Sequence, residues 1–180
     1  MRDFIKSTLG ILLLLILTSC PKITPEPKPE ELPPETQEGK DTFGCLVNGQ
    51  VWVPRVTVWV GQSRLVSSYH EGRLNLAARR VTDRYGYSEN QSLNVLVVKD
   101  VFSTGTFVVN SRHKDGRGRF NNLITKCIYE TDSIQYDGLV EITKLDTINH
   151  IVSGRFHFTA NSEDCGKVEV TEGRFDVRYP

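Results

Sequence analysis

The residues best suited to bind a charged ligand lie in one basic segment, Arg112–Arg119. It combines two glycines with four permanent positive charges, which belong to Arg112, Lys114, Arg117 and Arg119. Guanidinium and ammonium groups bind phosphates and acidic sugars through charge-assisted hydrogen bonds. The spacing therefore predicts a loop for an anionic ligand, although a solvated hairpin loop would have the same composition. A second basic cluster lies near Tyr85 and Tyr87 and contains Arg79, Arg80 and Arg84.

Histidines and carboxylates form no pattern that identifies a catalytic or metal site. His70, His113, His150 and His157 stand singly, without His-x-His or His-Glu-x-x-His spacing, and no Gly-x-Ser-x-Gly motif is present. Two acids at a suitable separation could hydrolyse a glycan, but no pair stands out among Glu141, Asp146, Glu169, Glu172 and Asp176. We expect Glu141, Glu169 and Asp176 on outward strand faces, paired with Lys and Arg. The sequence predicts no catalytic residue, no metal and no cofactor.

Three cysteines follow the N-terminal region: Cys45, Cys127 and Cys165. An exported domain can form disulfides, and three thiols leave one unpaired. We favour Cys127–Cys165, because both residues flank the C-terminal hairpins while Cys45 belongs to a separate strand pair. The alternative is that all three thiols are small buried hydrophobes.

The first 19 residues have the features of an export signal. Arg2 and Lys6 precede the apolar run Leu9–Leu17, whose nine residues are far fewer than the roughly 20 that span a bilayer. Leu17–Cys20 resembles the lipobox of bacterial lipoproteins. The resemblance implies cleavage before Cys20, with acyl chains on its thiol and its freed amine that anchor the protein stably. The alternative is an ordinary secretory signal with a chance cysteine.

A Pro- and Glu-rich segment separates this signal from the rest of the chain. Six of the eight prolines lie in Pro21–Lys40. Such a composition buries little apolar surface and favours an extended polyproline conformation. We therefore divide the chain into a signal peptide (1–19), a lipidated N-terminus with a flexible linker (20–41) and a globular domain (42–180). At about 3.1 Å per residue, the linker would reach roughly 60 Å from the lipid.

The domain has the period-two pattern of β-strands. Apolar and polar residues alternate over Leu74–Arg79 and Val152–Ala160, whereas the apolar run in Ser92–Lys99 predicts a central strand that is covered on both sides. Turn signals separate the strands, and Asn48-Gly49 is the clearest hairpin. We also expect a bulge at Glu172-Gly173, where the parity of apolar residues changes. These features predict nine or ten strands in a single antiparallel sandwich or partly open barrel.

Gly-Arg-Phe occurs three times, at Gly118–Phe120, Gly154–Phe156 and Gly173–Phe175. Because the separations differ, we interpret it as recurrent strand-entry chemistry and not as a repeat architecture.

The two ends of the domain also resemble a known family. The segments that carry the resemblance are Thr42–Trp52, Gly138–Asp146, Ile151–Phe158 and Val170–Val177. They are similar to a β-rich domain family of Bacteroidota lipoproteins whose function is uncharacterised. The resemblance implies a bacterial host of that group, a lipid anchor and a β fold. It supplies no catalytic residues and no ligand.

Together these features predict a lipid-anchored lipoprotein of the cell envelope, in the outer membrane. We expect a non-enzymatic binding or accessory module whose partner is an envelope protein or glycan. The formal net charge of 0 gives no global field for nucleic acid. Two alternatives are a glycan-acting hydrolase with an unidentified acid pair and a purely structural envelope component.

Overall fold

The computed structural model describes residues 30–57, 63–82, 88–97, 100–110, 116–131 and 138–180, and in these the chain is all-β. The twelve strands are β1 (Thr42–Val47), β2 (Gln50–Trp52), β3 (Arg55–Val56), β4 (Leu65–His70), β5 (Arg73–Val81), β6 (Asn90–Val97), β7 (Gly105–Val108), β8 (Gly116–Asn122), β9 (Cys127–Glu130), β10 (Gly138–Asp146), β11 (Ile151–Ser162) and β12 (Gly166–Arg178). The all-β prediction is confirmed. Among the described residues, none forms a helix long and apolar enough to cross a membrane.

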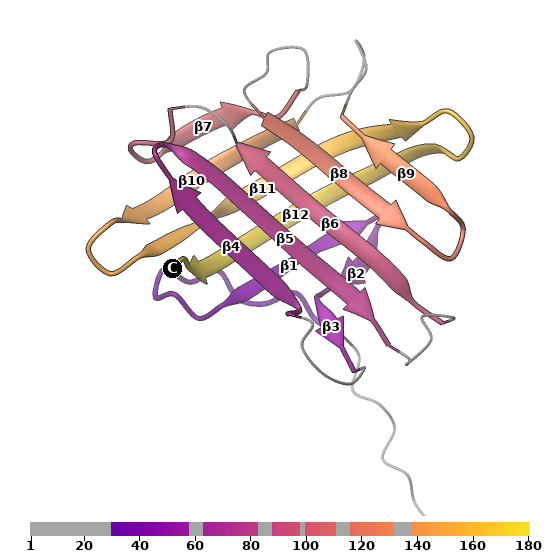
Figure 1. Cartoon of the computed structure of the whole chain (residues 1–180), viewed down its shortest axis with the longest axis horizontal. Helices are drawn as coiled ribbons and strands as arrows, with labels where there is room; N and C mark the ends of the chain where they lie inside the picture. The colour runs from indigo at the N-terminus through magenta and orange to yellow at the C-terminus, as the bar shows by residue number, and fades with distance from the viewer. Residues whose placement is uncertain (1–29, 58–62, 83–87, 98–99, 111–115, 132–137) are drawn as a thin grey trace, which may run out of the picture.

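The strands form one sheet that folds over into two layers. The hydrogen-bonded order is β2-β1-β12-β11-β9-β8-β6-β5-β3, with β10 on β11, β7 on β10 and β4 on β5. Figure 1 shows β4, β5, β6 and β8 as the nearer layer, crossing over β10, β11, β12 and β1 behind. The pairings are antiparallel except for β3 with β5, so the sheet is mixed and not purely antiparallel. The path ends at β2 and β3, which leaves the barrel partly open.

The core lies between the two layers, where the alternating strands bury their apolar faces. Leu74, Leu76 and Ala78 of β5 are fully buried. β6 lies between β5 and β8, and its residues Leu93, Val95 and Val97 are fully buried as well. The other layer contributes apolar side chains that are at most 2% exposed: Val140, Ile142, Phe156 and Phe158. β6 is central in the sheet, as predicted, but the prediction that both of its faces are covered is wrong, because Ser92 and Asn94 on its outer face are partly exposed.

The Gly-Arg-Phe motifs serve packing in mid-strand, so the strand-entry interpretation is wrong. Gly154 pairs with Phe175, and Phe156 pairs with Gly173, on the neighbouring strands β11 and β12. A Cβ atom at Gly173 would lie 2.6 Å from the Phe156 ring, and one at Gly118 would lie equally close to the ring of Phe158. Each glycine therefore leaves room for an aromatic ring of the core.

Local turn chemistry follows the sequence closely. Asn48 and Gly49 adopt φ angles of 50° and 79° between β1 and β2, as a two-residue hairpin turn requires. In β12 the register with β11 shifts by one residue between the pairs Phe156–Gly173 and Phe158–Val170. This is the expected bulge, and it brings Val168, Val170, Phe175 and Val177 to the same buried face.

A disulfide joins Cys127 of β9 to Cys165 in the turn between β11 and β12, with the Cα atoms 5.9 Å apart. This is the pairing that the sequence favoured. Cys45 is buried as a free thiol, and burial raises its pKa. A protonated thiol in the core is a poor nucleophile, so Cys45 acts as a small apolar side chain.

Candidate ligand-binding surfaces

The segment 30–41, which we call the strap, lies against the outer side of the layer that contains β10, β11 and β12. The sequence placed these residues in a flexible linker, but they contact the domain along their length. Glu30 forms ion pairs with Arg55 and Arg80. Glu35 accepts hydrogen bonds from Arg155 at 2.5 and 2.9 Å. The strap therefore covers one face of the domain.

Asp176 of β12 is the main attachment point of the strap. We expected it on an outward face among basic residues, and that expectation is wrong in one respect: the carboxylate is only 1% exposed. The side chain does point away from the core, but the strap closes over it. Five donors reach its two oxygens at 2.6–3.2 Å: the Thr36 and Ser153 hydroxyls and the backbone N–H groups of Glu38, Gly39 and Lys40.

These donors decide the charge of Asp176. Desolvation alone would raise its pKa, but the hydrogen bonds from Thr36, Ser153, Gly39 and Glu38 together lower the pKa to about 2. The carboxylate is therefore ionised at any ordinary pH, and hydrogen bonds from neutral donors stabilise its charge.

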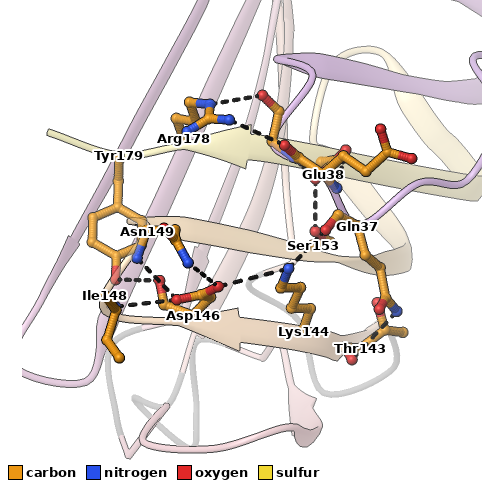
Figure 2. Close-up of polar contacts among 12 residues, drawn as sticks. Gln37, Glu38, Thr143, Lys144, Asp146, Ile148, Asn149, Ser153, Arg178 and Tyr179 are labelled. Carbon is orange, nitrogen blue, oxygen red and sulfur yellow. Dashed lines mark hydrogen bonds and ion pairs between the residues drawn. The ribbon is translucent and has the colours of Figure 1, made fainter.

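Arg178 and Lys144 hold the strap by its carbonyl groups (Figure 2). Arg178 donates to the carbonyls of Gly39 and Glu38 at 3.1 and 3.3 Å. Lys144 of β10 donates to the carbonyl of Gln37 at 2.9 Å, and its ammonium lies 3.7 Å from Asp146. The strap thus adds no hydrogen-bonded strand, but it is bound through both its N–H and its C=O groups.

A groove of about 390 Å³ lies next to the strap, and charged residues line it. Arg155 and Arg174 stand directly opposite each other on β11 and β12. Glu35 and Glu141 contact Arg155, while Glu172 contacts Arg174. The hydrogen bond from Arg155 lowers the pKa of Glu35, so this carboxylate does not have the raised pKa of a general acid.

A second cleft, of about 350 Å³, opens at the edge where the barrel is not closed. Trp52 of β2 is 4% exposed, and its indole N–H donates to Gln91 of β6 at 2.7 Å. Phe120 and Tyr129 line the same cleft, as does Arg80, which forms ion pairs with Glu89 and Glu30. Trp52 is therefore a core residue of this seam and not an exposed platform. Trp59 lies outside the described residues.

The basic segment of the sequence is only partly a loop. Arg112 and Lys114 lie outside the described residues, whereas Arg117 and Arg119 belong to β8. Gly116 and Gly118, which suggested loop flexibility, are buried strand residues. Arg117 and Arg119 lie 3.8 and 2.7 Å from the Glu130 carboxylate of β9.

The structure brings one arginine of the second basic cluster, Arg79, onto the same face as Arg117 and Arg119 of the first. Arg79 of β5 is opposite Ser92 of β6, and Ser92 is opposite Asn121 of β8. Arg79 and Arg119 are therefore on the same outer surface, although 40 residues separate them. Arg80 points to the seam instead, and Arg84 lies outside the described residues.

The remaining candidates are dispersed. His70 is exposed beside Glu71, His150 stacks on Tyr179 with ring centroids 5.2 Å apart, and His157 lines the groove near Arg155. Within the described part of the chain, His, Cys, Asp and Glu residues form no group of three that could hold a metal ion. Cys20 and His113 lie outside the described residues.

A family model called "Domain of unknown function (DUF6252)" matches residues 66–177, which is more than half of the chain. The chain belongs to this family. No curated protein and no solved structure matches the chain. The DUF6252 match runs from β4 to β12, so it contains the disulfide, Asp176 and the arginines of β5 and β8, while the strap and β1–β3 precede it.

Sequence reasoning missed the role of Asp176 and the strap. In the sequence, the feature that could have indicated it was a glycine, Gly39, within the Pro- and Glu-rich segment. In the structure this glycine adopts a φ of 70°. A glycine at that place is equally typical of a flexible linker. The partners of Asp176 in the strap lie 136 to 140 residues away, which no local pattern can reveal.

Proposed function

We propose that this chain is a Bacteroidota envelope lipoprotein whose DUF6252 domain is a non-enzymatic binding module. The proposal rests on the sequence Leu17–Cys20 for the lipid anchor and on the strap for the presentation of the domain. The disulfide is consistent with export, because disulfides persist in oxidising compartments.

The observation that carries the proposal is the attachment of the strap to Asp176. In this proposal the strap joins the domain to the lipid on Cys20, and it leaves the domain at Glu30, which forms ion pairs with Arg55 and Arg80. Nine residues, 21–29, lie between Cys20 and the strap. Even in an extended polyproline conformation they would span about 28 Å, which is less than half the reach of a fully free linker. The docked strap would therefore hold the domain closer to the membrane than a fully free linker would.

This arrangement favours a binding module over a catalyst. The groove nearest to the strap contains carboxylates, but these contact Arg155 and Arg174. The outer face of β5, β6 and β8 lies on the other layer and is not covered by the strap (Figure 1). Sites built on the strands of a scaffold hold their groups more precisely than sites on loops.

The first test is the fate of the Cys20→Ala variant in a bacterial host with lipoprotein processing. The wild type should partition with membranes and incorporate radiolabelled palmitate, whereas the variant should lose the label and leave the membrane fraction upon alkaline washing. Cys45→Ala, which changes another cysteine, is the matched control and should behave like the wild type. Palmitate labelling of Cys20→Ala, or its unchanged retention, would contradict the lipid anchor.

A second test concerns catalysis. The purified chain should release no reducing ends or soluble fragments from peptidoglycan and envelope polysaccharides over long incubations. Release by the wild type that is lost in Glu35→Gln or Glu141→Gln would contradict the non-enzymatic assignment.

A further inference from the structure

The outer face of β5, β6 and β8 carries four arginines, of which two form ion pairs with a described carboxylate. We call it the arginine face, and it consists of Arg73, Asn75, Ala77 and Arg79 on β5, Ser92 and Asn94 on β6, and Arg117, Arg119 and Asn121 on β8. The register aligns these residues in cross-strand rows, such as Ala77–Asn94–Arg119. The alternation of each strand turns the same residues away from the core.

Charge is unbalanced on this face, whereas the whole chain is neutral. Arg117 and Arg119 share a single carboxylate, that of Glu130. Arg73 and Arg79 are exposed, and within the described residues neither forms an ion pair. By contrast, Arg155, Arg174, Lys144 and Lys167 on the other layer each contact a carboxylate. Four arginines against one glutamate leave a cationic surface.

The shape of this face indicates an extended ligand. Neighbouring strands lie about 4.8 Å apart and successive residues rise about 3.4 Å, so Arg79 and Arg119 are separated by roughly 12 Å across the sheet. The clefts described above are lined by other residues. Ser92, Asn94 and Asn121 lie between Arg79 and Arg119, and Asn121 donates to Ser92 at 3.1 Å. Such groups hydrogen-bond to sugar hydroxyls, while arginine forms bidentate contacts with carboxylate or sulfate.

We infer that the arginine face binds an anionic polysaccharide, laid across β5, β6 and β8. The acidic groups of the polymer would contact Arg79 and Arg119, and its hydroxyls would contact Asn94 and Asn121. The choice of a glycan among polyanions rests on the proposed envelope location. The contact itself rests only on the geometry and charge of the face.

The test measures binding of the full-length chain in detergent to two polysaccharide probes. Dextran sulfate and polygalacturonate carry sulfate and carboxylate groups, and uncharged dextran is the reference. The wild type should bind both acidic polymers, more weakly as salt is raised, and should not bind dextran. The Arg79→Gln/Arg119→Gln variant should bind at least about ten-fold more weakly, since two charge-assisted contacts are lost.

A charge-matched control separates a site from general attraction. Lys40→Gln/Lys167→Gln removes the same charge from residues that pair with Glu38 and Glu169. This variant should retain nearly wild-type affinity. Equal losses in the two double variants, or no binding by the wild type, would overturn the inference. Tighter binding to double-stranded DNA of equal charge would replace the glycan by a nucleic acid.

Failure here is distinguishable from failure of the proposed function. Palmitate labelling and membrane retention of the wild type report on the lipid anchor whether or not the purified chain binds a polymer.

Discussion

The outer faces of the two layers differ, because the strap covers one of them and no described segment covers the other. On β10, β11 and β12, the strap covers Asp176 and Ser153, which are at most 1% exposed, and the neighbouring arginines contact carboxylates. On β5, β6 and β8, no described segment covers the sheet, and Arg73 and Arg79 face solvent. One outer face is thus an internal interface, and the other is a surface that remains available to a partner.

The comparison separates two uses of polar residues on a sheet. Around Asp176, five hydrogen bonds satisfy one buried charge, so these residues hold the molecule together. The arginine face has few internal contacts to lose. Substitutions on the covered face should therefore change stability, and those on the bare face should change binding. The predictions that follow test this division.

Asp176→Ala should have the largest effect. It leaves five donors without their acceptor in a buried place, and we expect a loss of about 3–5 kcal/mol in the free energy of unfolding, measured by urea denaturation. The strap should also become sensitive to limited proteolysis. Asp164→Asn, at an exposed turn position, is the control and should cost less than about 0.5 kcal/mol. If Asp176→Ala unfolds like the control, the strap does not depend on this carboxylate.

Local features of the fold were predictable because they are encoded by neighbours in sequence. Period-two alternation predicted the strands, and Asn-Gly, a pair that tolerates positive φ angles, predicted the turn at Asn48-Gly49. A change in the parity of apolar residues predicted the bulge near Gly173. The interpretation failed where a residue serves a distant partner. The sequence predicts that Gly118 is a loop glycine. In the structure the ring of Phe158, 40 residues away, occupies the space that a side chain at this position would fill.

The candidate surfaces depend even more on distant partners. Arg79 and Arg119 become neighbours only because β6 pairs with both β5 and β8, and no spacing along the chain encodes that register. The docking of the strap is equally non-local, since its composition alone favours a solvated chain. The disulfide was predictable by position relative to hairpins, because both cysteines flank the same C-terminal strands.

Removal of the disulfide should have the next largest effect, because it ties β9 to the turn after β11. The bond closes a loop with a sequence separation of 38, which in the chain-entropy model is equivalent to about 3–4 kcal/mol. Cys127→Ala/Cys165→Ala should lower the free energy of unfolding by that order. Cys45→Ala retains the disulfide and should cost no more than about 1 kcal/mol. A double variant as stable as Cys45→Ala would contradict the chain-entropy account.

Acid should weaken the covered face selectively. The pKa of Asp176 is lowered from 3.8 to about 2, so its ionised form stabilises the native state above the unfolded-state pKa. That contribution, about 2 kcal/mol, is complete above roughly pH 5 and is lost as the pH falls through about 4 toward 2. Urea midpoints between pH 2 and 7 should therefore fall more steeply for the wild type than for Asp176→Asn. Parallel pH profiles would show that another group causes the acid sensitivity.

The smallest effect on stability is expected for Arg79→Ala, and it gives the sharpest comparison with Arg155→Ala. Both arginines are exposed on outer strand faces, but Arg155 contacts Glu35 of the strap and Glu141 of β10. Removing Arg155 should cost about 0.5–1 kcal/mol and increase proteolysis of the strap. Removing Arg79 should change the free energy of unfolding by less than about 0.5 kcal/mol. If Arg79→Ala keeps its stability but binds polysaccharide more weakly, Arg79 serves binding and not the fold. If Arg79→Ala and Arg155→Ala lose comparable free energy of unfolding, Arg79 has a structural role instead.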